Sequence, residues 1–312
     1  MRPAFSVVFL TTLIGAGQGL AAALFAAEAG ARAGAWPMAP RDFFVAGAAA
    51  AVGLAALGLF ASFFHLGRPE RAWRTAAMWR TSWLSREVIA LPAFIAAAAG
   101  YGAAHAYAPS LSIAAGALAL LACIALFVCT AMVYAGIKFF QEWASPLTLA
   151  NFALIGTASG FTLASAMAAR MAPELAPGLA AWAAVLTLAA LVTRAASLLR
   201  NARLRPRSTL QSAIGIAHPR IEQKSRGFTG QSFNTQEFFH GASPEGMRGV
   251  MTVFLQMGFL IPIVLLVAGM KTGSADVLAA AFAIQYAGLI VERWFFLAQA
   301  THPQNLYYQG VS

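Results

Sequence analysis

Eight apolar segments, each about as long as a bilayer crossing requires, divide the chain. The segments are continuous and rich in alanine and leucine, which predicts helices, because the strands of a membrane barrel would alternate apolar and polar residues. We therefore expect an all-α, polytopic membrane bundle of eight transmembrane helices, forming a single integral membrane domain over residues 1–312. The predicted helices cover residues 4–28, 43–65, 87–107, 111–137, 147–170, 177–199, 248–270 and 276–299.

Composition supports a membrane protein. Hydrophobic residues make up 60% of the 312 residues and charged residues 10%, whereas a soluble domain carries roughly a quarter charged residues. The first segment follows Arg2 and ends in small residues, as a signal peptide does. It is too long for the apolar part of a signal peptide, so we expect a retained first helix.

The charges are unevenly divided between the two sides of the predicted bundle. Eight crossings place both ends of the chain on one side, here called side A, together with loops 65–86, 138–146 and 200–247. Because the opposite side, side B, holds equal numbers of basic and acidic residues, side A carries the whole net charge of +10. An excess of Lys and Arg predicts a cytoplasmic side, although the arginines can also serve an acidic partner. The side-B residues are Arg32, Arg41, Arg170, Lys271, Glu28, Asp42, Glu174 and Asp276.

The loop between the second and third segments carries the most distinctive chemistry. It begins with His65 at the end of one segment and ends with Glu87 at the start of the next. Pro69 favours a short helix, which we expect to lie along the interface with its aromatic residues at headgroup depth. Ser85 is the expected N-cap of the third helix, with Glu87 in its first turn. Between His65 and Glu87 lie Arg68, Arg71, Arg74, Arg80, Arg86, Trp73, Trp79 and Trp83.

A histidine and a carboxylate at one membrane boundary predict a quinone site. Quinone reduction takes up two protons, and both side chains can hydrogen-bond or relay them. Arg68 or Arg86 can stabilise anionic intermediates. Taken singly, His65 and Glu87 also fit a structural interpretation, since a helix dipole favours a cation in the last turn and a carboxylate in the first.

The remaining candidate ligands predict no metal site, haem or iron–sulfur cluster in this chain. Cys123 and Cys129 are six residues apart and form no CxxC motif. A b-type haem needs two histidines facing each other inside the bundle. His105 lies near side B, far from His65, and the other histidines fall in a loop or tail: His218, His240 and His302.

Three further features bear on packing and partners. Gly15 and Gly19 form a GxxxG pair that permits close helix approach, and Gln18 between them predicts an interhelical hydrogen bond. Glu292 and Arg293 lie within about two turns of side A, where ionisable groups pair, line a cavity or snorkel. The hydrophilic loop 200–247 is basic in its first part and aromatic over 228–241, which favours a docking surface for a partner subunit over a solvated loop.

Four sequence stretches together resemble the membrane anchor subunit of the dimethyl sulfoxide reductase family, a family of quinone-reactive anchors of molybdopterin oxidoreductases. They are HLGRPxRAW, RTSWLSREV, FNTQEFFHG and the closing HPQNLYY. The resemblance covers essentially the whole chain. It implies that His65 is the quinol-site histidine and Glu87 the essential glutamate. The family also includes the anchors of cytoplasmic sulfite-oxidising complexes.

The resemblance also implies the role and the partners. Such an anchor holds an iron–sulfur electron-transfer subunit and a molybdopterin catalytic subunit on the bacterial inner membrane, without haem or cluster of its own. It exchanges electrons with menaquinone or ubiquinone and is not the catalytic subunit. No nucleic acid is expected as a partner. The alternatives are a small-solute transporter, which would show a midplane site, and a purely structural anchor, which would not need the paired His65 and Glu87.

Overall fold

The chain folds into a bundle of membrane-length helices. The computed structural model describes residues 1–222, 224–225 and 239–307, and this part contains eight spans long and apolar enough to cross a membrane and no strand. The predicted all-α fold with eight crossings is therefore confirmed. The spans are α1 (Phe5–Arg32), α2 (Arg41–Ser62), α3 (Trp83–Tyr107), α4 (Ser112–Ala135), α5 (Pro146–Met171), α6 (Ala176–Ala202), α9 to α10 (Pro244–Leu255 and Ile261–Thr272) and α11 (Ala275–Ala298).

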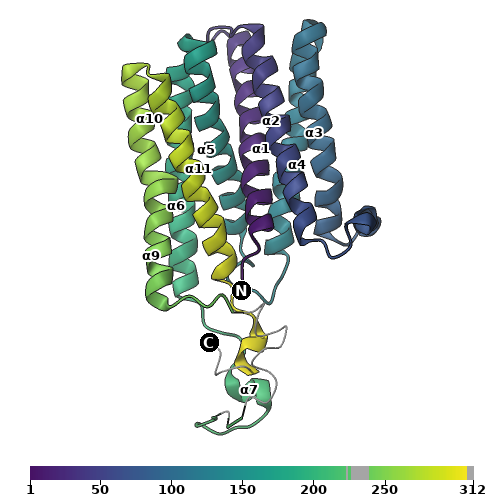
Figure 1. Cartoon of the computed structure of the whole chain (residues 1–312), viewed down its shortest axis with the longest axis vertical. Helices are drawn as coiled ribbons and strands as arrows, with labels where there is room; N and C mark the ends of the chain where they lie inside the picture. The colour runs from purple at the N-terminus through teal and green to yellow at the C-terminus, as the bar shows by residue number, and fades with distance from the viewer. Residues whose placement is uncertain (223, 226–238, 308–312) are drawn as a thin grey trace.

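Helix α1 is central to the bundle and packs against α2, α4, α5 and α11 (Figure 1). Of the residues in its apolar stretch, 72% are buried, against 28% for the span formed by α9 and α10. Helix α5 is nearly as enclosed, at 67%. The remaining spans surround this pair and present most of their apolar surface outward, as lipid-facing helices do.

Glycines let α1 and α5 approach closely. Gly15 and Gly19 of α1 meet Gly156 and Gly160 of α5, so that a Cβ atom at Gly160 would overlap the backbone of Gly19. The close approach predicted from the Gly15–Gly19 pair is therefore confirmed. Small residues at such a crossing bring two backbones into van der Waals contact, which is the main packing force available between helices in lipid.

Gln18 fastens α1 to α4 at the same level. Its amide nitrogen donates a hydrogen bond to the Cys123 carbonyl at 2.9 Å, and the Cys123 thiol lies 3.4 Å from the Gln18 carbonyl. The predicted interhelical hydrogen bond of Gln18 is confirmed. The bond satisfies a polar side chain that is 1% exposed, and such a group would be costly if unpaired.

The seventh span contains a π-helical turn. Residues Gln256–Leu260 join α9 to α10 in this conformation. Pro262 follows within one turn, and its missing N–H disturbs the regular hydrogen-bond ladder. The turn lies against α11, where a Cβ atom at Gly288 would overlap the backbone of Gly258. The π turn thus coincides with a tight contact between the last two spans.

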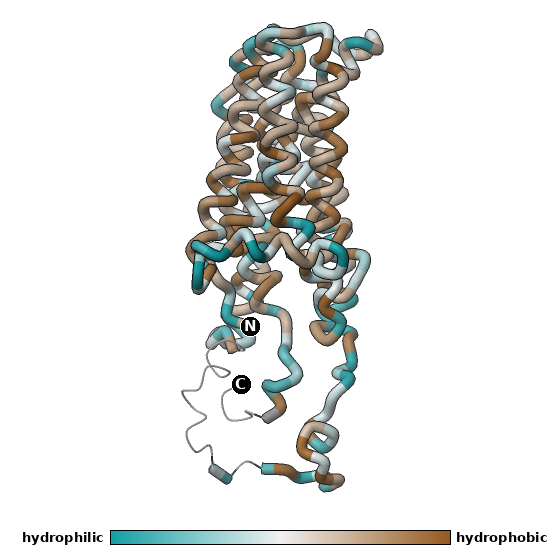
Figure 2. The backbone as a smooth tube through the Cα atoms, turned by 90° about the vertical axis from the view of Figure 1, so that its right-hand side faces the viewer, coloured by the Kyte–Doolittle hydropathy of each residue, from teal (hydrophilic) through white to brown (hydrophobic). Residues whose placement is uncertain are grey.

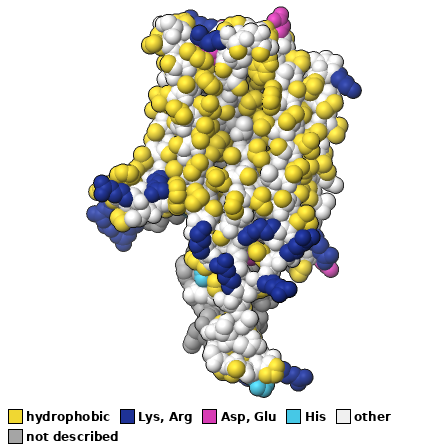
Figure 3. Space-filling view, turned by 180° about the vertical axis from the view of Figure 1, so that it is seen from behind, with side chains coloured by type: hydrophobic (Ala, Val, Ile, Leu, Met, Phe, Trp, Pro, Cys, Tyr) yellow, Lys and Arg dark blue, Asp and Glu magenta, His cyan; other side chains and the backbone are white. Residues whose placement is uncertain are grey.

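Polar residues gather at the two ends of the bundle, while its length is apolar (Figure 2). The N-terminus and η7 (Pro303–Tyr307), the last element of the described chain, lie at the same end of the bundle as α7 (Figure 1), as an even number of crossings requires. Lysine and arginine side chains form a band there (Figure 3). This end corresponds to side A. Short helices complete the described chain: η1 (Phe63–His65), η2 (Pro69–Met78), η3 (Pro109–Leu111), η4 (Pro173–Leu175), α7 (Leu210–Ile214) and η7 (Pro303–Tyr307).

The short helix expected after Pro69 is present as the 3₁₀ helix η2, with Pro69 at its first position. This helix is part of the loop that connects α2 to α3, and it projects from the side of the bundle at the side-A end (Figure 1). Its apolar side chains are open to the surroundings: Trp73 is 72% exposed and Met78 62%. Arginines at Arg71 and Arg74 accompany them. Such an amphipathic helix suits the boundary between lipid and water.

Candidate functional site

Glu87 lies inside α3 and is almost fully buried, with 8% of its surface exposed. The helix begins at Trp83, and the Ser82 hydroxyl caps it by accepting a hydrogen bond from the Ser85 amide. The expected cap at Ser85 is therefore wrong by one turn, because Ser82 has the extended backbone that an N-cap needs. Glu87 consequently sits in the second turn, where the helix dipole explains a carboxylate less well.

One donor from the described part of the chain reaches the Glu87 carboxylate. The hydroxyl of Thr130 on α4 donates to Glu87 Oε1 at 2.7 Å. A carboxylate withdrawn from water normally needs several donors or a cationic partner to remain charged. With a single neutral donor, the Glu87 carboxylate is well suited to exchange a proton.

His65 lies at the end of the second span, in the turn η1 that extends α2. Its side chain is exposed, and no hydrogen bond or ion pair to another described residue holds it. Close to it, an open apolar groove of about 360 Å³ runs between α1 and α2. The groove is lined by Ser6, Phe9, Leu13, Leu57, Phe60, Ala61 and Phe64.

The structure places His65 and Glu87 at the same end of two neighbouring helices but not in contact. His65 is at the outer surface, whereas Glu87 is buried and bonded to α4. No hydrogen bond or ion pair joins them within the described ranges. A ligand shared by both residues would have to reach from an exposed ring to a buried carboxylate, and the shared site stays a prediction.

The two arginines predicted to support the site differ in their surroundings. Arg86 donates hydrogen bonds to the carbonyls of Trp79 and Arg80 at 2.9 and 2.8 Å, and its guanidinium lies 4.2 Å from the centre of the Trp83 ring. These contacts fasten the end of the loop to the start of α3. Arg68 is exposed at the N-cap of η2. Arg86 is thus tied to loop structure, and Arg68 is available to a ligand or partner.

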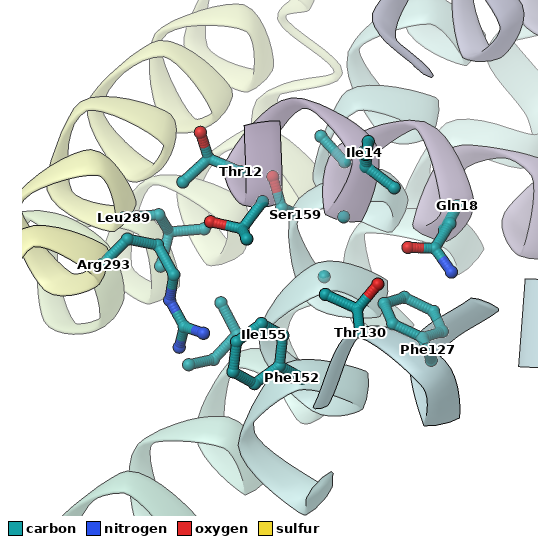
Figure 4. Close-up of a pocket in the computed structure, with 14 residues that line it drawn as sticks. Thr12, Ile14, Gln18, Phe127, Thr130, Phe152, Ile155, Ser159, Leu289 and Arg293 are labelled. Atoms are coloured by element: carbon teal, nitrogen blue, oxygen red, sulfur yellow. The ribbon is translucent and has the colours of Figure 1, made fainter. Parts of the chain in front are cut away.

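A small cavity, walled mainly by apolar side chains with several polar groups among them, lies inside the bundle beside Thr130 (Figure 4). Its volume of about 20 Å³ gives room for about one water molecule, so it cannot hold a quinone ring. Two polar groups on its wall, the Ser159 hydroxyl and Arg293 Nη2, are buried without a hydrogen-bond partner among the described residues. The other polar lining residues are Thr11, Thr12, Gln18 and Thr130.

A buried ion cluster adjoins this cavity. Glu292 of α11 lies between Arg194 of α6 and Arg293: its Oε1 is 2.7 Å from Arg194 Nε, and its Oε2 accepts a hydrogen bond from Arg293 Nε at 2.5 Å. The Arg194 contact is an ion pair without the alignment of a hydrogen bond. Aromatic rings enclose both guanidinium groups, with Phe254 5.5 Å from Arg194 and Phe152 4.3 Å from Arg293.

Sequence analysis identified Glu292 and Arg293 as an ionisable pair near side A but missed Arg194. A lone arginine near the end of the 177–199 segment is also compatible with snorkelling to the surface. No local signal in the sequence identifies it, because Arg194 meets Glu292 only when α6 packs against α11.

A third buried carboxylate, which was also not identified from the sequence, lies toward side B. Glu28 is 1% exposed. Its two oxygens accept hydrogen bonds from Arg32, Ser112 and Tyr101, and His105 Nε2 lies 3.2 Å from Oε2. These contacts join α1, α3 and α4. From the sequence, Glu28 was counted among the side-B charges. Its burial could not be predicted, because it depends on how α1, α3 and α4 pack together.

The described residues contain no group of three or more His, Cys, Asp or Glu that could hold a metal ion, and both cysteines are free. Of the predicted docking stretch 228–241, residues 228–238 lie outside the part of the chain that the structure describes.

The start of the basic loop is held against the bundle, because Arg200 donates a hydrogen bond to the Gln141 carbonyl at 3.0 Å. Near the end of the loop, burial lowers the pKa of His240.

Comparison with known proteins gives two matches. A family model described as "DMSO reductase anchor subunit (DmsC)" matches residues 6–298, which include almost all of every span. The chain is also 50% identical over 325 residues to a sulfite dehydrogenase subunit of Allochromatium vinosum, and the match covers 100% of both chains. The similarity therefore extends over the transmembrane bundle and the side-A loops alike.

Proposed function

The chain belongs to the DMSO reductase anchor subunit family, and we propose that it is the quinone-reactive membrane subunit of a multisubunit molybdopterin oxidoreductase. In this role it holds an iron–sulfur subunit and a molybdopterin catalytic subunit at side A. Electrons pass between that iron–sulfur subunit and the quinone pool. The observation that carries the proposal is Glu87, a buried carboxylate on a transmembrane helix with one neutral donor from the described part of the chain.

The proposed chemistry requires proton exchange at the membrane boundary. A quinone that accepts two electrons also takes up two protons to become a quinol, and the reverse reaction releases them. Glu87 serves as the acid or base for this exchange. His65, whose side chain is exposed, forms a hydrogen bond with the quinone ring. The groove beside His65 offers an apolar path for the tail of a lipid-soluble quinone.

The sulfite-oxidising type is the better supported member of this class. The relative that is 50% identical over both full chains is named as a sulfite dehydrogenase subunit. In a complex of that type, electrons run from the iron–sulfur subunit to quinone, so Glu87 supplies protons. We further propose that the chain resides in the bacterial inner membrane with side A in the cytoplasm, which the net charge of side A supports.

The test is quinone turnover by the purified complex carrying Glu87→Gln. Glutamine keeps the size of the side chain but cannot exchange a proton, so quinone-linked activity should fall at least about 100-fold. Activity of the catalytic subunit with an artificial electron acceptor should persist, since that route bypasses the anchor. Glu174→Gln is the matched control, because Glu174 is an exposed carboxylate at the side-B end.

Two outcomes would decide against the proposal. Full quinone turnover in the Glu87→Gln complex would remove Glu87 from the reaction. If His65→Ala also left turnover intact while the complex still needed this subunit to reach the membrane, the chain would be a purely structural anchor.

A further inference from the structure

In the side-A half of the bundle, the described residues include four charged or ionisable side chains that are buried: Glu87, Arg194, Glu292 and Arg293. Arg194 and Arg293 share the single carboxylate of Glu292, so this cluster has one positive charge in excess. An excess charge is costly in a space walled by aromatic rings and lipid. If Glu87 is ionised, the four groups together are neutral.

The cavity lies between this cluster and Thr130, the hydrogen-bond partner of Glu87. Thr130 and Arg293 lie on its wall, with Phe152 and Ile155 between them (Figure 4). The Thr130 hydroxyl gives its hydrogen to Glu87, so the Thr130 oxygen can accept a further hydrogen bond. On the other side, Arg293 Nη2 is a buried donor without a partner in the described residues.

A water molecule in the cavity, which has room for about one, would complete a chain of hydrogen bonds. In that chain Arg293 would donate to the water and the water to Thr130, which donates to Glu87. Every hydrogen in this chain points toward the Glu87 carboxylate, and aligned donors of this kind favour a negative charge at the end of the chain. The Ser159 hydroxyl on the same wall offers the water a further partner.

We propose that Arg293 is a positioning residue for Glu87: acting across the cavity, it stabilises the ionised carboxylate and sets the pH at which Glu87 takes up a proton. The effect on turnover rests on the proposed quinone function, but the coupling of the two charges does not. Arg194 belongs to the same cluster yet faces Phe254 and Phe295 and does not line the cavity.

The other titratable groups around Glu87 do not replace Arg293. On α4, Cys129 and Tyr134 lie within electrostatic reach of Glu87 and are neutral near pH 7. Arg86, on the same helix as Glu87, is bonded to the loop carbonyls, where water screens its charge. From the α2 side, His65 is exposed, as is Arg68 beyond it.

The experiment compares Arg293→Gln with Arg194→Gln in the purified complex. Each variant removes one positive charge from the same cluster and leaves Glu292 paired with the remaining arginine, but only Arg293 lines the cavity. Protonation of Glu87 is followed by the infrared carbonyl band of its protonated carboxyl, identified by its loss in Glu87→Gln. In Arg293→Gln the titration midpoint should move upward by about one pH unit or more. The shift in Arg194→Gln should be clearly smaller.

Equal shifts in the two variants, or none in Arg293→Gln, would overturn the proposal. Ser159→Val gives a second test that removes no charge: it fills the cavity and breaks the hydrogen-bond chain, so the midpoint should again move upward, and an unchanged midpoint counts against the proposal. If Glu87→Gln keeps full quinone turnover while the infrared shift is present, the proposed function fails and the coupling stands. If Glu87→Gln loses quinone turnover but Arg293→Gln shows no infrared shift, the proposed function stands and the coupling of Arg293 to Glu87 fails.

Discussion

Two buried glutamates in this bundle are held in opposite ways. Glu28 is surrounded by Arg32, Ser112, Tyr101 and His105, and both of its oxygens accept hydrogen bonds. Among the described residues, Thr130 is the one donor to Glu87. A carboxylate saturated with donors is fixed in its charged form and joins helices, whereas one with a single donor can change its protonation state at lower cost. Burial alone would not have separated these roles.

The first prediction at this scale concerns Thr130. Thr130→Val has nearly the same shape but removes the hydroxyl that donates to Glu87 Oε1. Since a hydrogen bond to a charged group contributes about 1.5–3 kcal/mol, quinone-linked activity near neutral pH should fall about 10- to 100-fold. Thr130→Ser restores the hydroxyl and should recover most of it. Steady-state quinone assays of the two assembled complexes provide the measurement, and equal activity would show that the hydroxyl is not needed.

The second prediction concerns Glu28. Glu28→Gln keeps the volume but leaves Arg32, Tyr101 and Ser112 without their shared acceptor, so the complex should lose about 1–3 kcal/mol of stability. Thermal unfolding of the purified complex measures this as a lower Tm. Quinone turnover per assembled complex should stay unchanged, because the cluster is at the opposite end from Glu87. A Tm equal to that of the unaltered complex would remove the structural role assigned to Glu28.

At the scale of helices, contacts between small residues determine which spans are neighbours. Apolar runs of bilayer length were sufficient to predict all eight spans, because a helix must satisfy its own backbone in lipid. The start of α3 was misplaced because Ser82 and Ser85 are equally good caps in sequence, and only the backbone conformation distinguishes them. The pairing of Gly15 and Gly19 with α5 could not be predicted either, since a glycine pair indicates a close contact without identifying the partner.

The third prediction tests that contact. Gly160→Ala places a methyl group against the backbone of Gly19, so α1 and α5 must separate. Overpacking of this kind costs about 1–3 kcal/mol and should lower the amount of folded subunit in membranes and its Tm. Gly100→Ala is the matched control, because a Cβ atom there meets nothing within 4 Å in α3. If both variants behave alike, close packing at Gly160 does not contribute to stability.

Over the whole molecule, the candidate functional residues are concentrated at one end. The loop helix η2, the basic band and the N-terminus lie at side A (Figures 1 and 3), and His65 ends the second span there. Sequence analysis could identify His65 and Glu87 because both flank one short, distinctive loop. It could not identify Thr130, Ser159 and Arg194, which come from three other helices and lie beside Glu87 or Arg293 only after the bundle has formed. Long-range packing of this kind leaves no local signal in the sequence.

The last prediction concerns orientation. Side B has no net charge, so the whole charge of +10 lies on side A, and basic residues near the membrane are retained in the cytoplasm during insertion. A fluorescent protein fused after Ser312 should therefore fold and fluoresce, whereas alkaline phosphatase at the same position should be inactive. A phosphatase fusion after Pro109, between α3 and α4 at side B, should show the opposite behaviour and serves as the control. An active phosphatase after Ser312 would place side A outside, and the proposed catalytic partners with it. The arginines would then have to be explained by an acidic partner surface, and a cytoplasmic sulfite-oxidising complex would no longer fit.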